Sequence, residues 1–387
     1  MKGGAKISVH RKLSVEKPVK LIFVGGFLGS GKTTALGALA RCLIQRGMRV
    51  GIITNDQTEN LVDTVIVKQM LSELGVPVEE VVEGCFCCKF DELLNQVEKI
   101  LTYNPDVLMG EPVGSCTDFV AAVANPIKIH YKDTFRFAPF STMVDPDRVR
   151  ELLLGETRPS FPEEVAYLFQ KQLEEADIIA LNKIDLLREE EKERLLSALE
   201  VKYPEKKVIA VSAKEGDGMD RWLDELLSGR PGANTVLRQI DYDRYAAAEA
   251  VLGWLNAALK MTASKPFDAN EFARTLAVTL REAFKSRDGE IGHLKFVITS
   301  AGKAMWVSVT HLTTEPNISG EQLGKLSKGS LIVNARVRLE PEELETIVRA
   351  SLSKVFEESS IQYEILDLQC FSPAYPEPPY LIRETVK

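Results

Sequence analysis

The sequence predicts an α/β protein: a doubly wound, mostly parallel sheet followed by a smaller α+β domain. Short apolar runs alternate with segments of helical periodicity over residues 20–230, which is typical of parallel strands joined by crossover helices. A glycine-rich loop at 25–31 separates the first run from the first helical segment. After Gly229-Arg-Pro-Gly232 the order of the segments changes, which indicates a linker and a second domain.

The first domain is expected over residues 19–230. The run 20–25 is apolar and ends in glycines, as suits a buried parallel strand. Leu36, Leu39 and Leu43 then recur at helical spacing up to Gly47, which ends the helix. The same alternation predicts further strands at 49–54, 78–82, 106–109, 140–144, 178–181 and 208–211, and helices at 32–46, 62–74, 91–101, 118–124, 162–175, 189–199 and 218–227.

The second domain is expected over residues 238–375. Strand-like and helix-like segments suggest a ferredoxin-like arrangement of strands around two helices. The expected strands are 291–299, 304–310, 331–339 and 361–370, and the expected helices are 270–284 and 342–357. Residues 1–18 read as a basic flexible tail and 376–387 as an extended, proline-bearing tail.

Composition excludes several classes of protein. The 387 residues are 45% hydrophobic and 27% charged, as in ordinary globular chains. With 56 acidic and 48 basic residues the net charge is −8, which argues against a nucleic-acid partner. No stretch approaches the ~18 apolar residues of a membrane span, so no membrane partner is expected. The N-terminal stretch lacks the apolar core of a signal peptide, and the expected compartment is cytoplasmic.

The strongest motif is Gly26-Phe-Leu-Gly-Ser-Gly31-Lys32-Thr33, which matches the phosphate-loop pattern. Its glycines let backbone N–H groups cradle phosphate oxygens, Lys32 would neutralise the β- and γ-phosphates, and the Thr33 hydroxyl would hold Mg²⁺. The helix that begins there adds its positive end. The expected phosphate-binding residues are Gly26, Gly29, Ser30, Gly31, Lys32, Thr33 and Thr34.

Two loops favour GTP over ATP. Asn182-Lys183-Ile-Asp185 follows a predicted strand, and a carboxylate there would accept hydrogen bonds from guanine N1–H and N2–H₂, which adenine does not offer. Ser212-Ala213-Lys214 follows the next strand and would bring a backbone N–H to guanine O6. The expected base-binding residues are Asn182, Lys183, Asp185, Ser212, Ala213 and Lys214.

Carboxylates follow two other predicted strands. Glu111 would lie near Mg²⁺ and the γ-phosphate, and Asp56 would hold Mg²⁺ or its water. Glu59 and Asp63 lie in the same loop as Asp56, where solvated loop acids are an equal alternative. We expect Lys32, Glu111 and Asp56 to be catalytic, and no arginine suggests itself as an internal finger, so intrinsic turnover should be slow.

Three of the six cysteines, Cys85, Cys87 and Cys88, fall within four residues. Thiolates at this spacing can converge on a soft or borderline ion such as Zn²⁺. Three sulfurs leave a tetrahedral site one ligand short, unless Asp56, Glu59, a water or a partner supplies the fourth. Buried small hydrophobes and a redox Cys-x-x-Cys pair are the alternatives. Cys42, Cys116 and Cys370 are expected to be structural.

With these motifs the chain resembles the CobW/HypB/UreG family of P-loop GTPases, on the CobW side. The matching features are Gly26–Thr33, Cys85-Phe-Cys87-Cys88, Glu111-Pro-Val-Gly114, Asn182–Asp185 and Ser212–Lys214, and the second domain resembles the CobW C-terminal domain by position and size. Asn55-Asp-Gln-Thr-Glu59 departs from the usual CobW pattern and is closer to the nickel-inserting relatives, and a His-rich stretch is missing.

The resemblance implies a GTP-binding and GTP-hydrolysing metallochaperone, with Mg²⁺ and a transition metal, Zn²⁺ or Co²⁺, as cofactors. The metal ligands expected from the motifs and the resemblance are Thr33, Asp56, Glu59, Glu111, Cys85, Cys87 and Cys88. The partner would be a client metalloprotein or metallocofactor enzyme, and a homodimer across the nucleotide is one possible assembly. The alternative is a GTP-dependent activator or gate of a corrinoid or other metallocofactor enzyme without metal carriage.

Overall fold

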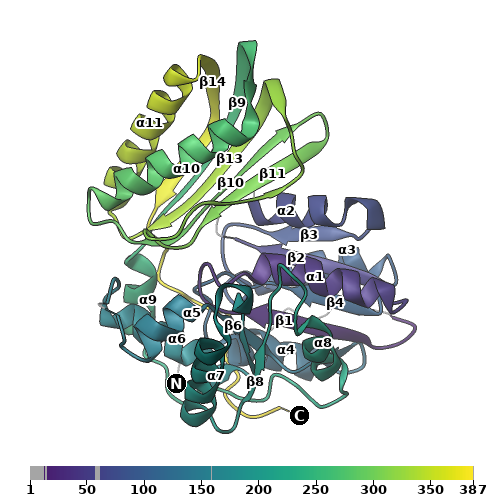
Figure 1. Ribbon diagram of the computed structural model, residues 1–387. Coiled ribbons are helices and arrows are strands. Elements are labelled where there is room, and N and C mark those ends of the chain that lie inside the picture. Colours follow the sequence, from purple (N-terminus) through teal and green to yellow (C-terminus); the bar gives the residue numbers. More distant parts are fainter. Residues whose placement is uncertain (1–12, 14, 57–61, 158, 387) are drawn as a thin grey trace.

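A computed structural model describes residue 13 and residues 15–56, 62–157 and 159–386. Two sheets organise them (Figure 1). The first sheet is formed by residues up to Ala210 and the second by residues from Gly253 onward. The predicted fold class, a mostly parallel α/β sheet followed by a smaller α+β unit, is confirmed.

The first sheet has the strand order β3-β2-β4-β1-β6-β7-β8, with β5 paired to β1, and its pairs are parallel. The strands are short and mostly buried, as expected when helices cover both faces of a sheet. Their bounds are β1 Val19–Gly25, β2 Val50–Asn55, β3 Val78–Val81, β4 Val107–Gly110, β5 Phe135–Phe137, β6 Ser141–Val144, β7 Ile178–Leu181 and β8 Lys207–Ala210.

The helices of this part follow the predicted alternation. They are α1 Lys32–Gln45, α2 Val62–Met70, α3 Phe90–Leu101, α4 Asn125–His130, α5 Pro146–Arg148, α6 Glu163–Glu175, α7 Glu189–Lys202 and α8 Met219–Leu227. The helix expected over 62–74 is shorter, because α2 ends at Met70 and a 3₁₀ turn, Ser72–Leu74, follows. The helix expected over 118–124 is a π-helical turn, Val120–Ala124, that runs into α4.

The second sheet is antiparallel, in the order β12-β11-β10-β13-β9-β14. Its strands are β9 Gly253–Asp268, β10 Ile291–Ser300, β11 Lys303–Val309, β12 Asn317–Gly320, β13 Lys325–Val337 and β14 Ile361–Phe371, and its helices are α10 Ala269–Lys285 and α11 Pro341–Glu358. The path β9-α10-β10-β13-α11-β14 is the ferredoxin-like order, and the β11–β12 hairpin widens it at one edge.

Several elements have no counterpart among the predicted ones, among them β5, α5, β9, β12 and the helix α9, Tyr242–Ala250. β9 is the largest omission, because it pairs with both β13 and β14 in the middle of the sheet. Its sequence, Gly253-Trp-Leu-Asn-Ala-Ala-Leu-Lys, contains residues of low β-propensity, and pairing on both sides overrides that propensity.

Strand alternation gives the second sheet two different faces. Leu294, Phe296 and Ile298 of β10 belong to the core formed with α10 and α11, which lie together on one side of the sheet (Figure 1). Val297, between them, faces the opposite way and packs with Val62 and Ile66 of α2. The face of the second sheet that α10 and α11 leave uncovered therefore lies against the first part of the chain, beside the glycine loop.

The described residues after β14 form no helix or strand and return to the first sheet's side of the molecule (Figure 1). The Ile382 backbone N–H donates to Ala121 O at 2.9 Å, and Arg383 forms an ion pair with Asp118. Tyr380 packs edge-on against Phe90 at the start of α3. No helix in the described part of the chain combines the length and the apolar character that crossing a membrane requires.

A candidate nucleotide and metal site

The glycine loop joins β1 to α1 and is built so that only glycine fits at its end. Gly31 has a φ of +96°, in the left-handed region, and a Cβ there would lie 2.4 Å from Asn182 Nδ2. That amide nitrogen donates to Ser30 O at 2.8 Å. Asn182, which belongs to the first of the two predicted base-binding loops, therefore fixes the end of the glycine loop.

Lys32 begins α1 and is buried. Its Nζ donates to Gly26 O at 2.8 Å, so the side chain folds back over the loop that it belongs to. Burial lowers the pKa of Lys32, and Glu111 opposes that effect. A phosphate group in the loop would give this ammonium an anionic partner in place of a carbonyl.

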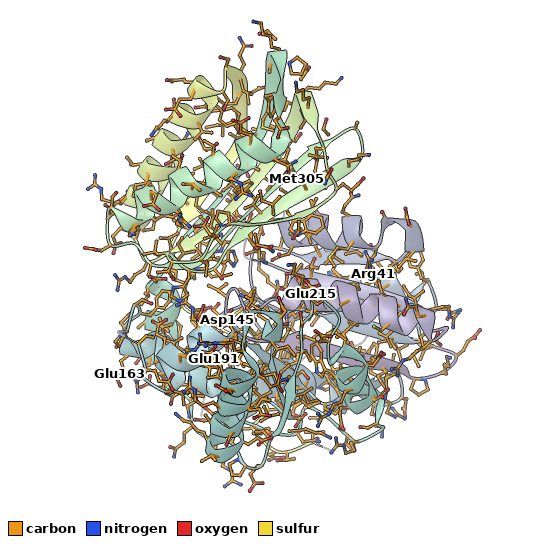
Figure 2. The ribbon with its side chains drawn as sticks, in the orientation of Figure 1. Arg41, Asp145, Glu163, Glu191, Glu215 and Met305 are labelled. Carbon is orange, nitrogen blue, oxygen red and sulfur yellow. The ribbon has the colours of Figure 1, made fainter. Side chains whose placement is uncertain are left out.

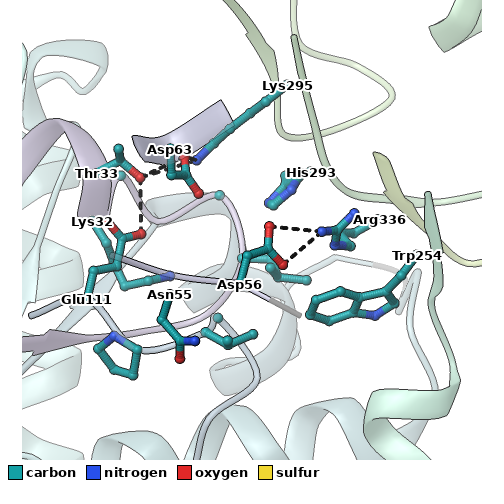
Figure 3. Close-up of a pocket in the computed structure, with 16 residues that line it drawn as sticks. Lys32, Thr33, Asn55, Asp56, Asp63, Glu111, Trp254, His293, Lys295 and Arg336 are labelled. Carbon is teal, nitrogen blue, oxygen red and sulfur yellow. Dashed lines mark hydrogen bonds and ion pairs between the residues drawn. The ribbon is translucent and has the colours of Figure 1, made fainter. Parts of the chain in front are cut away.

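Thr33, Asp63 and Glu111 converge at the start of α1 (Figure 3). The Thr33 Oγ1 atom lies 3.0 Å from Asp63 Oδ1 and 3.0 Å from Glu111 Oε1. Among the described residues, the buried Glu111 Oε2 atom has no hydrogen-bond partner. Burial and the nearby Asp63 raise the pKa of Glu111 to about 7. Hard oxygen ligands around an unpartnered carboxylate oxygen fit Mg²⁺.

One of the predicted magnesium ligands, Asp56, has its partners in the second sheet. Asp56 points toward the second sheet (Figure 3), where Arg336 Nη2 lies 3.0 Å from each of its carboxylate oxygens and Asn334 Nδ2 lies 3.1 Å from Oδ2. Glu59 lies outside the described residues. Asp63, which the sequence left as an even choice between ligand and solvated acid, reaches Thr33 alongside Glu111.

Side chains of the second sheet complete the pocket, which sequence reasoning did not foresee. Lys295 of β10 has its Nζ 2.7 Å from Asp63 Oδ1 and 3.4 Å from Thr33 Oγ1. Burial works against the ionised form of Asp63, but Lys295 outweighs it and lowers the pKa of Asp63 to about 2. Burial and then Lys295 and Arg336 hold the pKa of the neighbouring His293 well below its usual range, so this imidazole is neutral.

Arg336 of β13 is fully buried and lies over the Trp254 ring of β9, with its guanidinium carbon 4.2 Å from the ring centroid. It sits opposite both Trp254 and His293 in the strand register. The sequence pattern that could have indicated the pocket residues of the second sheet is strand alternation. Positions 293 and 295, and likewise 334 and 336, are polar and lie between apolar core positions. On a strand such positions normally face water.

The two predicted base-binding loops come together at the ends of β7 and β8. Asn182 Oδ1 accepts a hydrogen bond from the Ala213 backbone N–H at 2.9 Å, and Ser212 Oγ donates to Asp185 Oδ1 at 2.6 Å. Lys183 has a left-handed φ of 60° and forms an ion pair with Asp145, which lies on the side of the first part that faces the second sheet (Figure 2). Lys214 is exposed and pairs with Glu215.

The thiols of Cys85, Cys87 and Cys88 lie within 4.8 Å of one another, as the motif predicts for metal ligands. A turn formed by hydrogen bonds from Cys88 N and Lys89 N to Cys85 O brings them together just before α3. Cys116, expected to be structural, joins them: its Sγ lies 3.9 Å from Cys87 Sγ. The other thiols donate toward Cys85, with Cys116 contributing most, and hold the pKa of Cys85 well below its usual range.

Asn55, at the end of β2, connects this thiol loop to the phosphate side. Its Nδ2 donates to Gly84 O at 2.7 Å, and its Oδ1 accepts from the Phe86 backbone N–H at 2.9 Å. The next residue, Asp56, lines the pocket beside Lys32 and Thr33 (Figure 3). Asn55, which also lines the pocket, therefore links the backbone of the thiol loop to the phosphate side.

A glycine loop between a buried strand and a helix, with Lys32 and Thr33 at the helix start, defines a phosphate-loop nucleotide-binding domain. Residues 20–210 match the family model described as the CobW/HypB/UreG nucleotide-binding domain. This part of the chain belongs to that family, which agrees with the GTPase expected from its motifs.

Two curated relatives bear the name zinc chaperone CobW. The one from Sinorhizobium sp. is 29% identical over 182 residues, 42% of this chain and 50% of the relative. The one from Pseudomonas aeruginosa is 27% identical over 262 residues, 59% of this chain and 66% of the relative. The chain thus spans about half to two thirds of the length of these relatives. The solved structure of the Zn(II)-bound YjiA GTPase from E. coli aligns with 88% of this chain and 99% of its own, at 18% identity and a TM-score of 0.34.

Proposed function

We propose that this protein is a GTP-hydrolysing metallochaperone, which binds a transition metal ion through its thiol loop and delivers it to a client metalloprotein or cofactor pathway. The observation that carries the proposal is the cluster of Cys85, Cys87 and Cys88 thiols within 4.8 Å of one another. Several thiolates at this spacing suit Zn²⁺, and Co²⁺ is the second ion that the family resemblance implies.

The nucleotide would be GTP with Mg²⁺. Lys32 and the glycine loop would hold the phosphates, and Thr33 and Glu111 would hold the magnesium ion, which neutralises charge as the terminal phosphate leaves. Asp185 would accept hydrogen bonds from the guanine edge, and Ser212 Oγ, which donates to Asp185 Oδ1, would orient its carboxylate. The names of the two zinc-chaperone relatives support the metal cargo.

Asn55 supports the coupling of nucleotide to metal. It holds both sides of the thiol loop, through Gly84 and Phe86, while its neighbour Asp56 lies in the nucleotide pocket. A change at the pocket on hydrolysis would therefore shift the backbone that positions the thiols. Such local changes with remote effects are the usual device of nucleotide switches.

The test is metal binding with and without nucleotide. Zn²⁺ affinity is measured by competition with a chromophoric chelator, for the wild type and for Cys87→Ala, each alone, with GDP and with a non-hydrolysable GTP analogue. The expected result is tight, thiolate-dependent binding that differs between the two nucleotides and is lost in Cys87→Ala. Cys42→Ala is the matched control, because Cys42 lies on α1, away from the thiol cluster. Equal binding by wild type and Cys87→Ala in every nucleotide state would remove the basis of the proposal.

A further inference from the structure

We infer that Cys116 is the fourth ligand of the metal site, so that the bound ion is held by four thiolates from two separate segments of the chain. The inference rests on the proposed metal binding and adds to it a residue that stands outside the Cys-x-Cys-Cys motif. Cys116 follows β4, whereas the other three thiols precede α3.

Two of the sulfur–sulfur distances are those of a tetrahedral site. With Zn–S bonds of about 2.3 Å, the sulfurs of a four-thiolate zinc site lie about 3.8 Å apart. The Cys87 and Cys88 sulfurs are 3.8 Å apart, and the Cys116 and Cys87 sulfurs are 3.9 Å apart. Cys116 lies outside the group of thiols that are all within 4.8 Å of one another, so its side chain would have to move closer to hold an ion together with the other three.

Burial favours a closed site. Cys85, Cys87 and Cys116 are each less than a tenth exposed, and Cys88 is half-buried. The first carboxylate considered as a fourth ligand, that of Asp56, is held by Arg336 of the second sheet. Cys116 therefore supplies the missing ligand from within the chain, and neither a water nor a partner protein is needed to complete the tetrahedron.

The position of Cys116 gives the metal a direct link to the nucleotide. Glu111 stands at one end of the buried segment 111–116, next to Thr33, and Cys116 stands at the other. Gln172 of α6 ties the segment together, because its Nε2 donates to Gly114 O at 2.9 Å and to Cys116 O at 3.1 Å. Ser115 Oγ donates to the buried Glu249 of α9 at 2.5 Å.

A displacement of Glu111 when the terminal phosphate leaves would pull on Cys116 and change the site from four thiolates to three. A closed four-thiolate site retains its ion, and a three-thiolate site has an open position where a client's ligand can bind. The inference thus explains how one ion can be both held tightly and handed over.

X-ray absorption at the zinc edge tests the inference directly, because it counts sulfurs around the ion. The protein is loaded with one equivalent of Zn²⁺ and the non-hydrolysable GTP analogue. The wild type is expected to fit four sulfurs at about 2.3 Å. Cys116→Ser is expected to fit three sulfurs and one oxygen or nitrogen, and to hold Zn²⁺ less tightly by at least about 10- to 100-fold, the loss typical when only an outer-shell partner of a ligand is removed. Cys370→Ser, on β14, should match the wild type.

The outcomes separate the two proposals. A wild-type protein that binds Zn²⁺ with three sulfurs, or a Cys116→Ser protein with an unchanged sulfur count, would overturn the role of Cys116 and leave the metallochaperone intact. A wild type that binds no Zn²⁺ in any nucleotide state would overturn both. The sulfur count of the wild type needs no variant, so the result stands even if Cys116→Ser fails to fold.

Discussion

Arg336 Nη2 lies 3.0 Å from both carboxylate oxygens of Asp56, although the two residues are 280 positions apart in the chain. The pair is buried, and it joins the end of β2 to the second sheet. The same guanidinium donates through Nη1 to Leu255 O and to Asn256 Oδ1 within its own sheet. Arg336 therefore stands between the nucleotide pocket and the second sheet and fixes how the two meet.

The first prediction concerns the energy of this pair. Asp56→Asn and Arg336→Met each leave a buried group without its charged partner, and each should lower the free energy of unfolding by about 3–5 kcal/mol. The double variant should lose less than the sum, with a coupling of about 1–3 kcal/mol, measured by urea denaturation. Simple additivity of the two single changes would show that the ion pair contributes nothing of its own.

The second prediction concerns Lys295, which carries a positive charge to the mouth of the phosphate pocket from the second sheet. Because a triphosphate is more negative than a diphosphate, Lys295→Met should weaken binding of a GTP analogue by about tenfold and weaken GDP binding less. Isothermal titration calorimetry with both nucleotides gives the two affinities. Lys303→Met, an exposed change on neighbouring β11, should leave both unchanged. A uniform loss for GTP and GDP would contradict a contact near the terminal phosphate.

The third prediction tests the base. Asp185→Asn replaces an acceptor by an amide that presents donors to the guanine edge, so affinity for GDP should fall by about 10- to 100-fold. Affinity for xanthosine diphosphate (XDP) should rise, because xanthine has a carbonyl oxygen where guanine has its amino group. Fluorescent nucleotide competition measures both. Glu189→Gln, at the exposed start of α7, provides the control. If ADP competes as well as GDP with the wild type, the guanine assignment is wrong.

The fourth prediction concerns pH. Burial, and then the neighbouring Asp118, raise the pKa of Glu175 from 4.5 to about 8, while the backbone N–H groups of Phe119 and Val120 oppose the shift. The folded protein thus keeps a proton that the unfolded chain releases above pH 4.5. This group's contribution to stability is complete below that pH and is lost as the pH rises toward 8.

Glu175→Gln removes that titration. The free energy of unfolding of the wild type, relative to the variant, should fall between pH 5 and 8 by up to about 1.4 kcal/mol per pH unit. Thermal or urea unfolding across this range measures the difference. Glu174→Gln, a partly exposed neighbour paired with Lys171, should show no such trend. A difference that stays constant from pH 5 to 8 would refute the buried protonated carboxyl.

Most of the first sheet could be predicted because its signals are local. Gly26–Thr33 needs only its own glycines, lysine and threonine to define the loop, and each apolar run of four to seven residues marks a buried strand. The second sheet was harder to predict: β9 carries alanines at core positions and an exposed lysine between two of these positions, and only its neighbours β13 and β14 make it a strand.

The site divides in the same way. Lys32, Thr33, Glu111, Asn182 and Asp185 could be proposed from the sequence because each belongs to a short motif next to a strand end. Lys295 and Arg336 could not, because an isolated polar residue on a strand usually faces solvent. Asp56 could be predicted only in part. Its position in the pocket follows from the strand before it, but its partner, Arg336, comes from the other sheet.

The sequence by itself determined the phosphate loop, the guanine-type loops and a thiol loop one ligand short of a tetrahedron, since each is a property of a few consecutive residues. Only the tertiary structure decided that Cys116 lies 3.9 Å from Cys87 and that Lys295 lies 2.7 Å from Asp63. These pairs are far apart along the chain. The pairing of strands within the first sheet brings Cys116 to Cys87, and the packing of the two sheets brings Lys295 to Asp63, so no local pattern encodes either distance.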